Sequence, residues 1–168
     1  MQFPTARSLF ALVFALSTGL VAGGLYLAMA LNLAACPLCI IQRMLYLALV
    51  VVALGGLSLP RCRLSQTLAA LSGVLISGTG MFVAGYQVWL QRFAHDVSCT
   101  ANAPWWEEMV YWAGEKLPLL FQANGLCSDP GWKFLGLAIA DWSVLAFTAL
   151  LLISLLTLIK IKQQTPKK

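Results

Sequence analysis

Four long apolar stretches constrain the fold of this chain more than any other feature. They cover residues 9–31, 40–59, 68–90 and 142–159. Three of them contain no charged residue, and the second contains only Arg43, close to its start. At about 1.5 Å per residue, a bilayer hydrocarbon core of about 30 Å takes roughly 17 to 25 residues, and each stretch has such a length. We therefore expect four membrane-spanning helices.

The composition supports the same fold class. Of the 168 residues, 60% are apolar and 10% are charged, whereas a soluble domain has about 25% charged residues. A chain this short buries too little of its surface to hide so many apolar side chains in a water-soluble fold. The composition therefore excludes ordinary soluble enzymes, disordered proteins and coiled coils. It predicts a single integral membrane domain, an all-α four-transmembrane-helix bundle.

The uneven distribution of charge predicts the orientation of the bundle. If the spans alternate, one side carries Arg7, Arg61, Arg63, Lys160, Lys162, Lys167 and Lys168. Positive charge near the ends of spans marks the cytoplasmic side. We therefore expect cytoplasmic N and C termini, with segments 32–39 and 91–141 on the outer side of the membrane. The net charge of +5 then reflects membrane topology and not a nucleic-acid surface.

The long outer segment is expected to carry a short amphipathic helix. Pro104 suits a first helical position. One side of this helix would carry Trp105, Met109, Trp112 and Ala113, and the other Glu107, Glu108, Tyr111 and Glu115. Such a helix can lie flat in the headgroup zone. This helix would serve either as a simple aromatic anchor at the membrane surface or in an active role.

The cysteines indicate the chemistry. They are Cys36, Cys39, Cys62, Cys99 and Cys127. All except Cys62 would face outward, and an even number of cysteines in an oxidising compartment indicates disulfides. We interpret the cytoplasmic Cys62 as a bystander. A structural Cys99–Cys127 disulfide would close a long loop and stabilise the fold by about 3 to 4 kcal/mol.

Cys36 and Cys39 form a CxxC pair, for which a structural disulfide is a poor explanation because it closes almost no loop. Such spacing is typical of redox or metal sites. Zinc needs further Cys or His ligands, and His95 is the single histidine. The c-type haem pattern is absent because Ile40 follows Cys39. We therefore favour redox exchange and expect no metal.

Arg43 is the candidate cofactor-binding residue. Cys39 begins the second span, where the helix dipole favours a thiolate, and Arg43 lies one turn deeper on the same face. An arginine within a membrane is a functional candidate by default, although snorkelling to the interface is an alternative. The sequence has no dinucleotide-binding glycine motif, haem ligand pair or iron–sulfur cysteine set. A lipid-soluble quinone, ubiquinone or menaquinone, is then the expected electron acceptor.

Several motifs together resemble the DsbB family of bacterial disulfide bond formation proteins, over nearly the whole chain. They are Cys36-Pro-Leu-Cys39-Ile-Ile-Gln-Arg43, Trp89-Leu-Gln-Arg92, and Gly125-Leu-Cys127 followed by Trp132-Lys-Phe-Leu-Gly136. The resemblance implies an inner-membrane oxidoreductase that reoxidises DsbA, a periplasmic thioredoxin-like protein, and delivers electrons to a quinone.

The resemblance also implies the order of events at the cysteines. The partner's thiol would attack Cys99, the freed Cys127 would attack Cys36, and Cys39 would pass electrons to the quinone beside Arg43. Some family members have a histidine implicated in quinone binding where this chain aligns Arg92. The single histidine, His95, comes three residues later, so that ligand is not assigned to either residue.

Three alternatives compete with this interpretation. One is a small membrane scaffold or channel subunit with two structural disulfides, which would resist exchange with a glutathione-like pool. Another is an oxidoreductase similar to vitamin K epoxide reductase, in which the CxxC pair typically lies in a late helix. The third is a lipoprotein signal ending at Cys36, but the apolar run before it is longer than the usual 7 to 15 residues.

Overall fold

Four long helices form the body of the protein. The computed structural model describes residues 5–58, 63–93 and 105–163. The long helices are α1 (Ala6–Ala30), α2 (Pro37–Ser58), α3 (Arg63–Phe93) and α6 (Ile139–Gln163). Each is long and apolar enough to cross a membrane. The predicted four-helix membrane bundle is thus confirmed.

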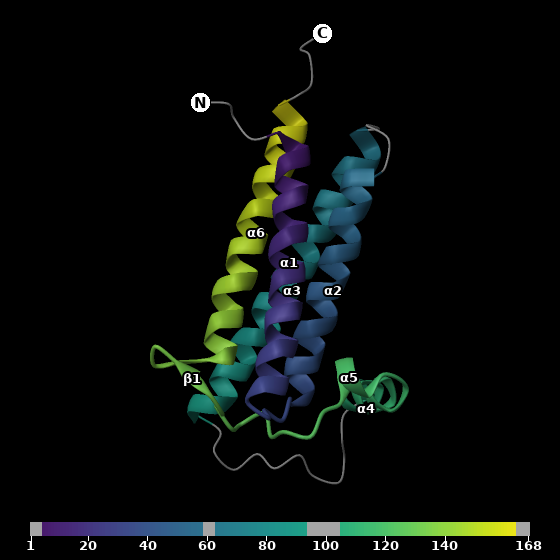
Figure 1. Ribbon diagram of the computed structural model, residues 1–168. Coiled ribbons are helices and arrows are strands. Elements are labelled where there is room, and N and C mark those ends of the chain that lie inside the picture. Colours follow the sequence, from purple (N-terminus) through teal and green to yellow (C-terminus); the bar gives the residue numbers. More distant parts are fainter. Residues whose placement is uncertain (1–4, 59–62, 94–104, 164–168) are drawn as a thin grey trace.

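The connection between α3 and α6 carries the smaller elements. They are α4 (Trp105–Lys116), α5 (Pro118–Phe121), β1 (Lys133–Phe134) and β2 (Leu137–Ala138). Figure 1 shows the long helices side by side, with the start of α1 and the end of α6 at one end of the bundle. The smaller elements all lie at the opposite end, together with the start of α2.

The expected amphipathic helix corresponds to α4, with one difference on its polar side. Trp105 and Trp112 are exposed, as expected of residues that face a membrane surface. Glu107, however, is only 5% exposed and Val110 is fully buried. The reason is that α4 packs against α2, so part of the side that we expected to meet water is covered by protein.

The core at the middle of the bundle is built around a stacked aromatic pair. The rings of Tyr46 and Phe147 are parallel within 3°, with 4.2 Å between their centroids. A Cβ atom at Gly80 would lie 2.2 Å from the Phe147 ring, so the absence of a side chain there lets α3 and α6 approach closely.

A short hairpin precedes α6. Lys133 pairs with Ala138 and Phe134 with Leu137 in antiparallel register. The two turn residues, Leu135 and Gly136, have φ angles of 53° and 79°, which is typical of the tight turns that match strand twist. The sequence analysis did not predict this hairpin. Its one aromatic side chain, Phe134, lies against Trp132 just before the hairpin and Trp142 in α6.

Candidate active site

Cys36 and Cys39 lie together at the start of α2. Their sulfurs are 3.0 Å apart. The Cys39 amide N–H donates to Cys36 Sγ over 3.4 Å, and the Ile40 N–H donates to the Cys36 carbonyl over 3.1 Å. Cys36 therefore caps the helix, and Pro37 occupies a first-turn position that suits it. Free N–H groups at a helix start favour negative charge on these sulfurs.

The segment that leads to Cys127 is docked on the residues just before Cys36. The N–H groups of Asn124 and Gly125 both donate to the Ala35 carbonyl over 2.9 Å. A Cβ atom at Gly125 would lie 2.4 Å from the Ala34 carbonyl oxygen. Because a backbone atom cannot easily move aside, only glycine permits this approach.

This docking brings Cys127 to Cys36. Both side chains are buried in one cluster with Leu38 and Leu90. A hydrogen bond from Cys36 lowers the pKa of the Cys127 thiol, and the same contact raises the pKa of Cys36. Since the thiolate is the nucleophilic form of cysteine, this contact favours the nucleophilic form at Cys127 over that at Cys36.

Two glutamines that the sequence analysis did not single out complete the surroundings of the CxxC pair. Gln87 of α3 donates through Nε2 to Cys36 Sγ at 3.3 Å and to Cys39 Sγ at 3.2 Å. Gln42 of α2 donates through Nε2 to Gln87 Oε1 at 2.7 Å. A polar residue within an apolar span is a signal that could have identified them.

Arg43 lies one turn below Cys39, as predicted. Its Nη1 donates to the carbonyl of Leu120 in α5 over 2.5 Å. The guanidinium therefore binds the loop to the bundle, a contact that sequence reasoning did not foresee. Arg43 also borders a cavity.

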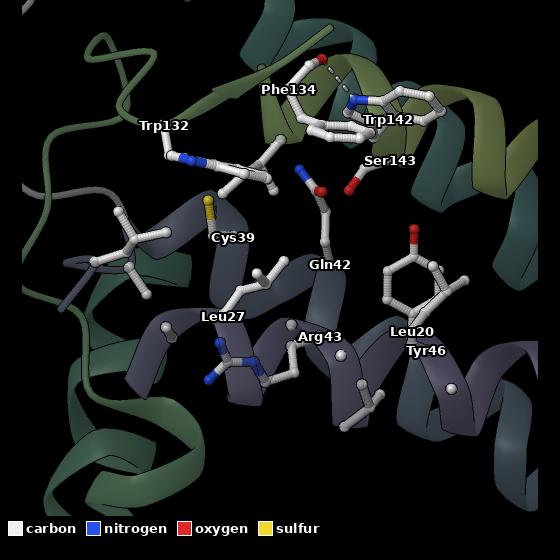
Figure 2. A pocket seen from close by; sticks show the side chains of 18 of the residues that line it. Leu20, Leu27, Cys39, Gln42, Arg43, Tyr46, Trp132, Phe134, Trp142 and Ser143 are labelled. Atoms are coloured by element: carbon white, nitrogen blue, oxygen red, sulfur yellow. Dashed lines mark hydrogen bonds between the residues drawn. The ribbon is translucent and has the colours of Figure 1, made fainter. Parts of the chain in front are cut away.

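The cavity has a volume of about 520 Å³ and lies between α1, α2, α6 and the hairpin. Figure 2 shows aromatic residues along one side and residues of α1 along the other. The aromatic side chains are Trp132, Phe134 and Trp142. The polar side chains at its wall are Cys39, Gln42, Arg43, Tyr46 and Ser143. Cys39 is thus the CxxC sulfur that faces the cavity.

Among the cysteines and the histidine considered for the site, Cys62, His95 and Cys99 lie outside the described residues, as do Arg61, Pro104, Lys167 and Lys168. Arg92 is described, and it is not among the residues that line the cavity. It forms an ion pair with Asp141 instead. The structure therefore brings together Cys36, Cys39, Cys127 and Arg43 of the predicted site.

Comparison with known proteins agrees with this arrangement. The family model described as "Disulfide bond formation protein DsbB" matches residues 6–157. The disulfide bond formation protein B of Dechloromonas aromatica is 44% identical over 147 residues, which cover 84% of this chain and 86% of the relative. The protein of the same name from Nitrosomonas europaea is 37% identical, covering 88% and 90%. That from Polaromonas sp. JS666 is 36% identical, covering 94% of each.

The four apolar helices, the clustered cysteines and the family match over most of the chain lead to one conclusion. The chain belongs to the DsbB family and is a multi-pass membrane oxidoreductase that acts on thiols and disulfides.

Proposed function

We propose that this protein reoxidises a periplasmic, thioredoxin-like dithiol protein of the DsbA type and passes the electrons to a membrane quinone. The observation that carries the proposal is the order of three sulfurs. Cys127 lies against Cys36, Cys36 contacts Cys39, and Cys39 borders the cavity. A loop cysteine is thereby connected to a lipid-level cavity by successive contacts.

The proposed topology puts this end of the bundle in the periplasm of a bacterial inner membrane, with both termini in the cytoplasm. Arg63 begins α3, and Lys160 and Lys162 lie in the last turn of α6. These basic residues are at the end of the bundle opposite the CxxC pair. Positive charge near span ends favours the cytoplasmic side, which supports this orientation.

The first exchange involves Cys99 and Cys127 as a disulfide. A thiolate of the partner attacks Cys99, a partner–Cys99 bond forms, and Cys127 leaves as a thiolate. Cys127 then attacks Cys36, so that a Cys36–Cys127 bond forms and Cys39 leaves as a thiolate. The lowered pKa of Cys127 favours it as the leaving group in the first exchange and raises its thiolate fraction for the second.

The partner's second thiolate then attacks the mixed disulfide, which releases the oxidised partner and the Cys99 thiolate. Cys99 attacks Cys127 in the Cys36–Cys127 bond and restores the loop disulfide, with Cys36 as leaving group. The balance is one disulfide gained by the partner and one lost by the CxxC pair. Two electrons then remain on Cys36 and Cys39.

The cavity suits a quinone. Its walls are mainly aromatic and aliphatic, and its volume of about 520 Å³ is within the range of small-molecule sites. The buried Tyr46 hydroxyl has no hydrogen-bond partner of good geometry among the described residues, although Ser143 lies nearby (Figure 2). Arg43 and Tyr46 offer donors for carbonyl oxygens, while the aromatic wall excludes water. A bound quinone supplies a two-electron, two-proton acceptor next to Cys39.

Quinone reduction by the purified protein tests the proposal. A reduced thioredoxin-like dithiol protein is added with a short-chain ubiquinone, or in parallel a short-chain menaquinone, and quinone absorbance and thiol content are followed. We expect one quinone reduced per partner disulfide formed, and no turnover in Cys39→Ser. A scaffold with structural disulfides would reduce neither quinone, and its bridges would resist a glutathione buffer.

A further inference from the structure

Gln42 and Gln87 are buried amides in membrane-spanning helices to which the electron route above assigns no role. Their exposed fractions are only 4% and 2%. An amide at such a depth is costly unless its polar groups are hydrogen-bonded, and a polar residue within a span is a functional candidate. The hydrogen-bond partners of these two amides therefore indicate their role.

The Gln87 amide contacts both sulfurs of the CxxC pair. Its Nε2 is 3.3 Å from Cys36 Sγ and 3.2 Å from Cys39 Sγ. A side-chain amide nitrogen carries two hydrogens, so a single group can donate to each sulfur. Gln87 comes from α3, whereas both cysteines lie at the start of α2, so this contact joins two helices at the reacting atoms.

Gln42 determines which end of the Gln87 amide meets the sulfurs. Its Nε2 donates to Gln87 Oε1 over 2.7 Å. With the carbonyl engaged in this way, the NH₂ group of Gln87 faces the cysteines. The reverse orientation would put a carbonyl oxygen against the sulfurs and leave a developing thiolate without a donor.

We propose that Gln87 is a positioning residue that holds the sulfurs of Cys36 and Cys39 and favours their reduced form over the disulfide. The inference rests on the proposed function. When Cys127 attacks Cys36, the Cys36–Cys39 bond breaks and its electron pair goes to Cys39. The Gln87 N–H then donates to a thiolate, and hydrogen bonds to ionised groups are stronger than those to neutral ones. The CxxC pair becomes easier to reduce.

The redox equilibrium of the CxxC pair tests this proposal. Full-length protein carrying Cys99→Ser and Cys127→Ser is purified from a quinone-deficient host, so that CxxC is the only exchanging pair. It is equilibrated with dithiothreitol buffers, alkylated with a maleimide polymer and resolved by gel shift. Gln87→Met should lower the equilibrium constant for reduction about tenfold, which is about 30 mV for two electrons.

Gln91→Met is the matched control. It is the same substitution one turn later in α3, where the amide reaches the Asp129 carbonyl at 3.4 Å and neither sulfur. We expect its equilibrium constant to equal that of the parent protein. Equal constants for Gln87→Met and Gln91→Met would overturn the proposal.

Gln42→Met provides a second test, which also serves if Gln87→Met does not fold. It should also lower the equilibrium constant for reduction of the CxxC pair, but by less than Gln87→Met does. The reason is that Gln87 keeps its NH₂ donors and loses only the hydrogen bond that orients them. The double variant should match Gln87→Met, since Gln42 acts through Gln87. Two results would overturn the assigned orientation of the Gln87 amide. One is an unchanged equilibrium constant for CxxC reduction in Gln42→Met, and the other is a double variant whose effect equals the sum of the two single effects. A parent pair that does not exchange at all would instead overturn the proposed function.

Discussion

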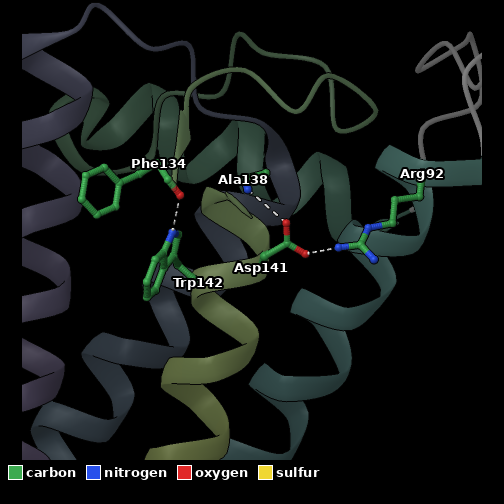
Figure 3. Close-up of polar contacts among 5 residues, drawn as sticks. All are labelled: Arg92, Phe134, Ala138, Asp141 and Trp142. Atoms are coloured by element: carbon green, nitrogen blue, oxygen red, sulfur yellow. Dashed lines mark hydrogen bonds and ion pairs between the residues drawn. The ribbon is translucent and has the colours of Figure 1, made fainter. Parts of the chain in front are cut away.

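Arg92 and Asp141 form an ion pair that joins the end of α3 to the start of α6, with 2.8 Å between Arg92 Nη2 and Asp141 Oδ1. The second Asp141 oxygen accepts a hydrogen bond from the Ala138 N–H in β2 over 3.0 Å. Trp142 Nε1 donates to the Phe134 carbonyl over 3.3 Å (Figure 3). The ion pair thus positions the hairpin, which contributes Phe134 to the aromatic wall of the cavity.

Asp141→Ala should therefore weaken quinone binding without greatly destabilising the fold. Arg92 is 58% exposed, and such partly exposed pairs contribute about 0 to 1 kcal/mol to stability. The apparent KM for quinone should rise several-fold while the thermal midpoint changes little. Glu108→Ala, which removes an exposed carboxylate on α4, is the control. An unchanged KM in Asp141→Ala would show that the hairpin does not need this anchor.

Arg43→Ala should raise the apparent KM for quinone and leave exchange between the loop and the partner intact. Loss of a charge-assisted hydrogen bond costs about 1.5 to 3 kcal/mol, or about 10- to 150-fold in affinity. Arg43→Lys should recover only part, because an ammonium lacks the planar fork of donors.

Steady-state kinetics at varied quinone concentration measures the KM for quinone. Partner oxidation in a single turnover measures the exchange between the loop and the partner separately. Arg43 also binds the Leu120 carbonyl, so limited proteolysis of the loop should report any loosening of α5. A normal quinone KM in both variants would contradict a ligand role for Arg43.

Gly125→Ala should slow the exchange between Cys127 and Cys36. The new Cβ atom would lie 2.4 Å from the Ala34 carbonyl oxygen, so the loop must move away from Ala35 and carry Cys127 with it. The Cys36–Cys127 bond should then form more slowly after the reduced partner is added, which quenched-flow alkylation followed by mass spectrometry would detect. Gly78→Ala is the control because a Cβ atom there meets no atom of the described residues within 4 Å. Equal rates of Cys36–Cys127 bond formation in the two variants would contradict the docking role of Gly125.

The pH dependence of Cys127 alkylation should respond in opposite directions to two substitutions. The hydrogen bond from Cys36 is the largest influence and lowers the pKa of Cys127, whereas the nearby charge of Glu107 raises it. Cys36→Ala should therefore move the alkylation profile of the reduced protein to higher pH, and Glu107→Gln should move it to lower pH. Site-resolved mass spectrometry after brief iodoacetamide treatment measures both. If both substitutions moved the alkylation profile in the same direction, the assigned influences of Cys36 and Glu107 on the pKa of Cys127 would be contradicted.

Much of the fold follows from the sequence because membrane spans are specified by long local runs of apolar residues. The CxxC pair, with Arg43 one turn deeper, is equally local and was predictable. The contact of Gln87 with Cys36 was not, because it joins residues 51 positions apart through the rotation of α3 about its axis.

The hairpin was also beyond the sequence analysis. Its turn puts Leu135, a residue that rarely adopts positive φ, at 53°. The ion pair of Arg92 with Asp141 and the side-chain hydrogen bond of Trp142 with Phe134 accompany this conformation, and such tertiary contacts override local preference. The role of Arg92 as an anchor for the hairpin became visible only with these contacts.

The direction of electron flow gives the last prediction. Cys127 is only 9% exposed and lies against Cys36, so it is poorly placed to meet a soluble partner. If Cys99 meets the partner, Cys127→Ser removes the thiol that the partner displaces and leaves Cys99 able to hold a mixed disulfide. That complex should appear as a heavier band on a non-reducing gel and disappear on reduction. Cys99→Ser should trap much less, because the remaining loop thiol is buried. Equal trapping by both variants would reverse the assigned order of attack, and no trapping with continued quinone reduction would make the loop pair a purely structural disulfide.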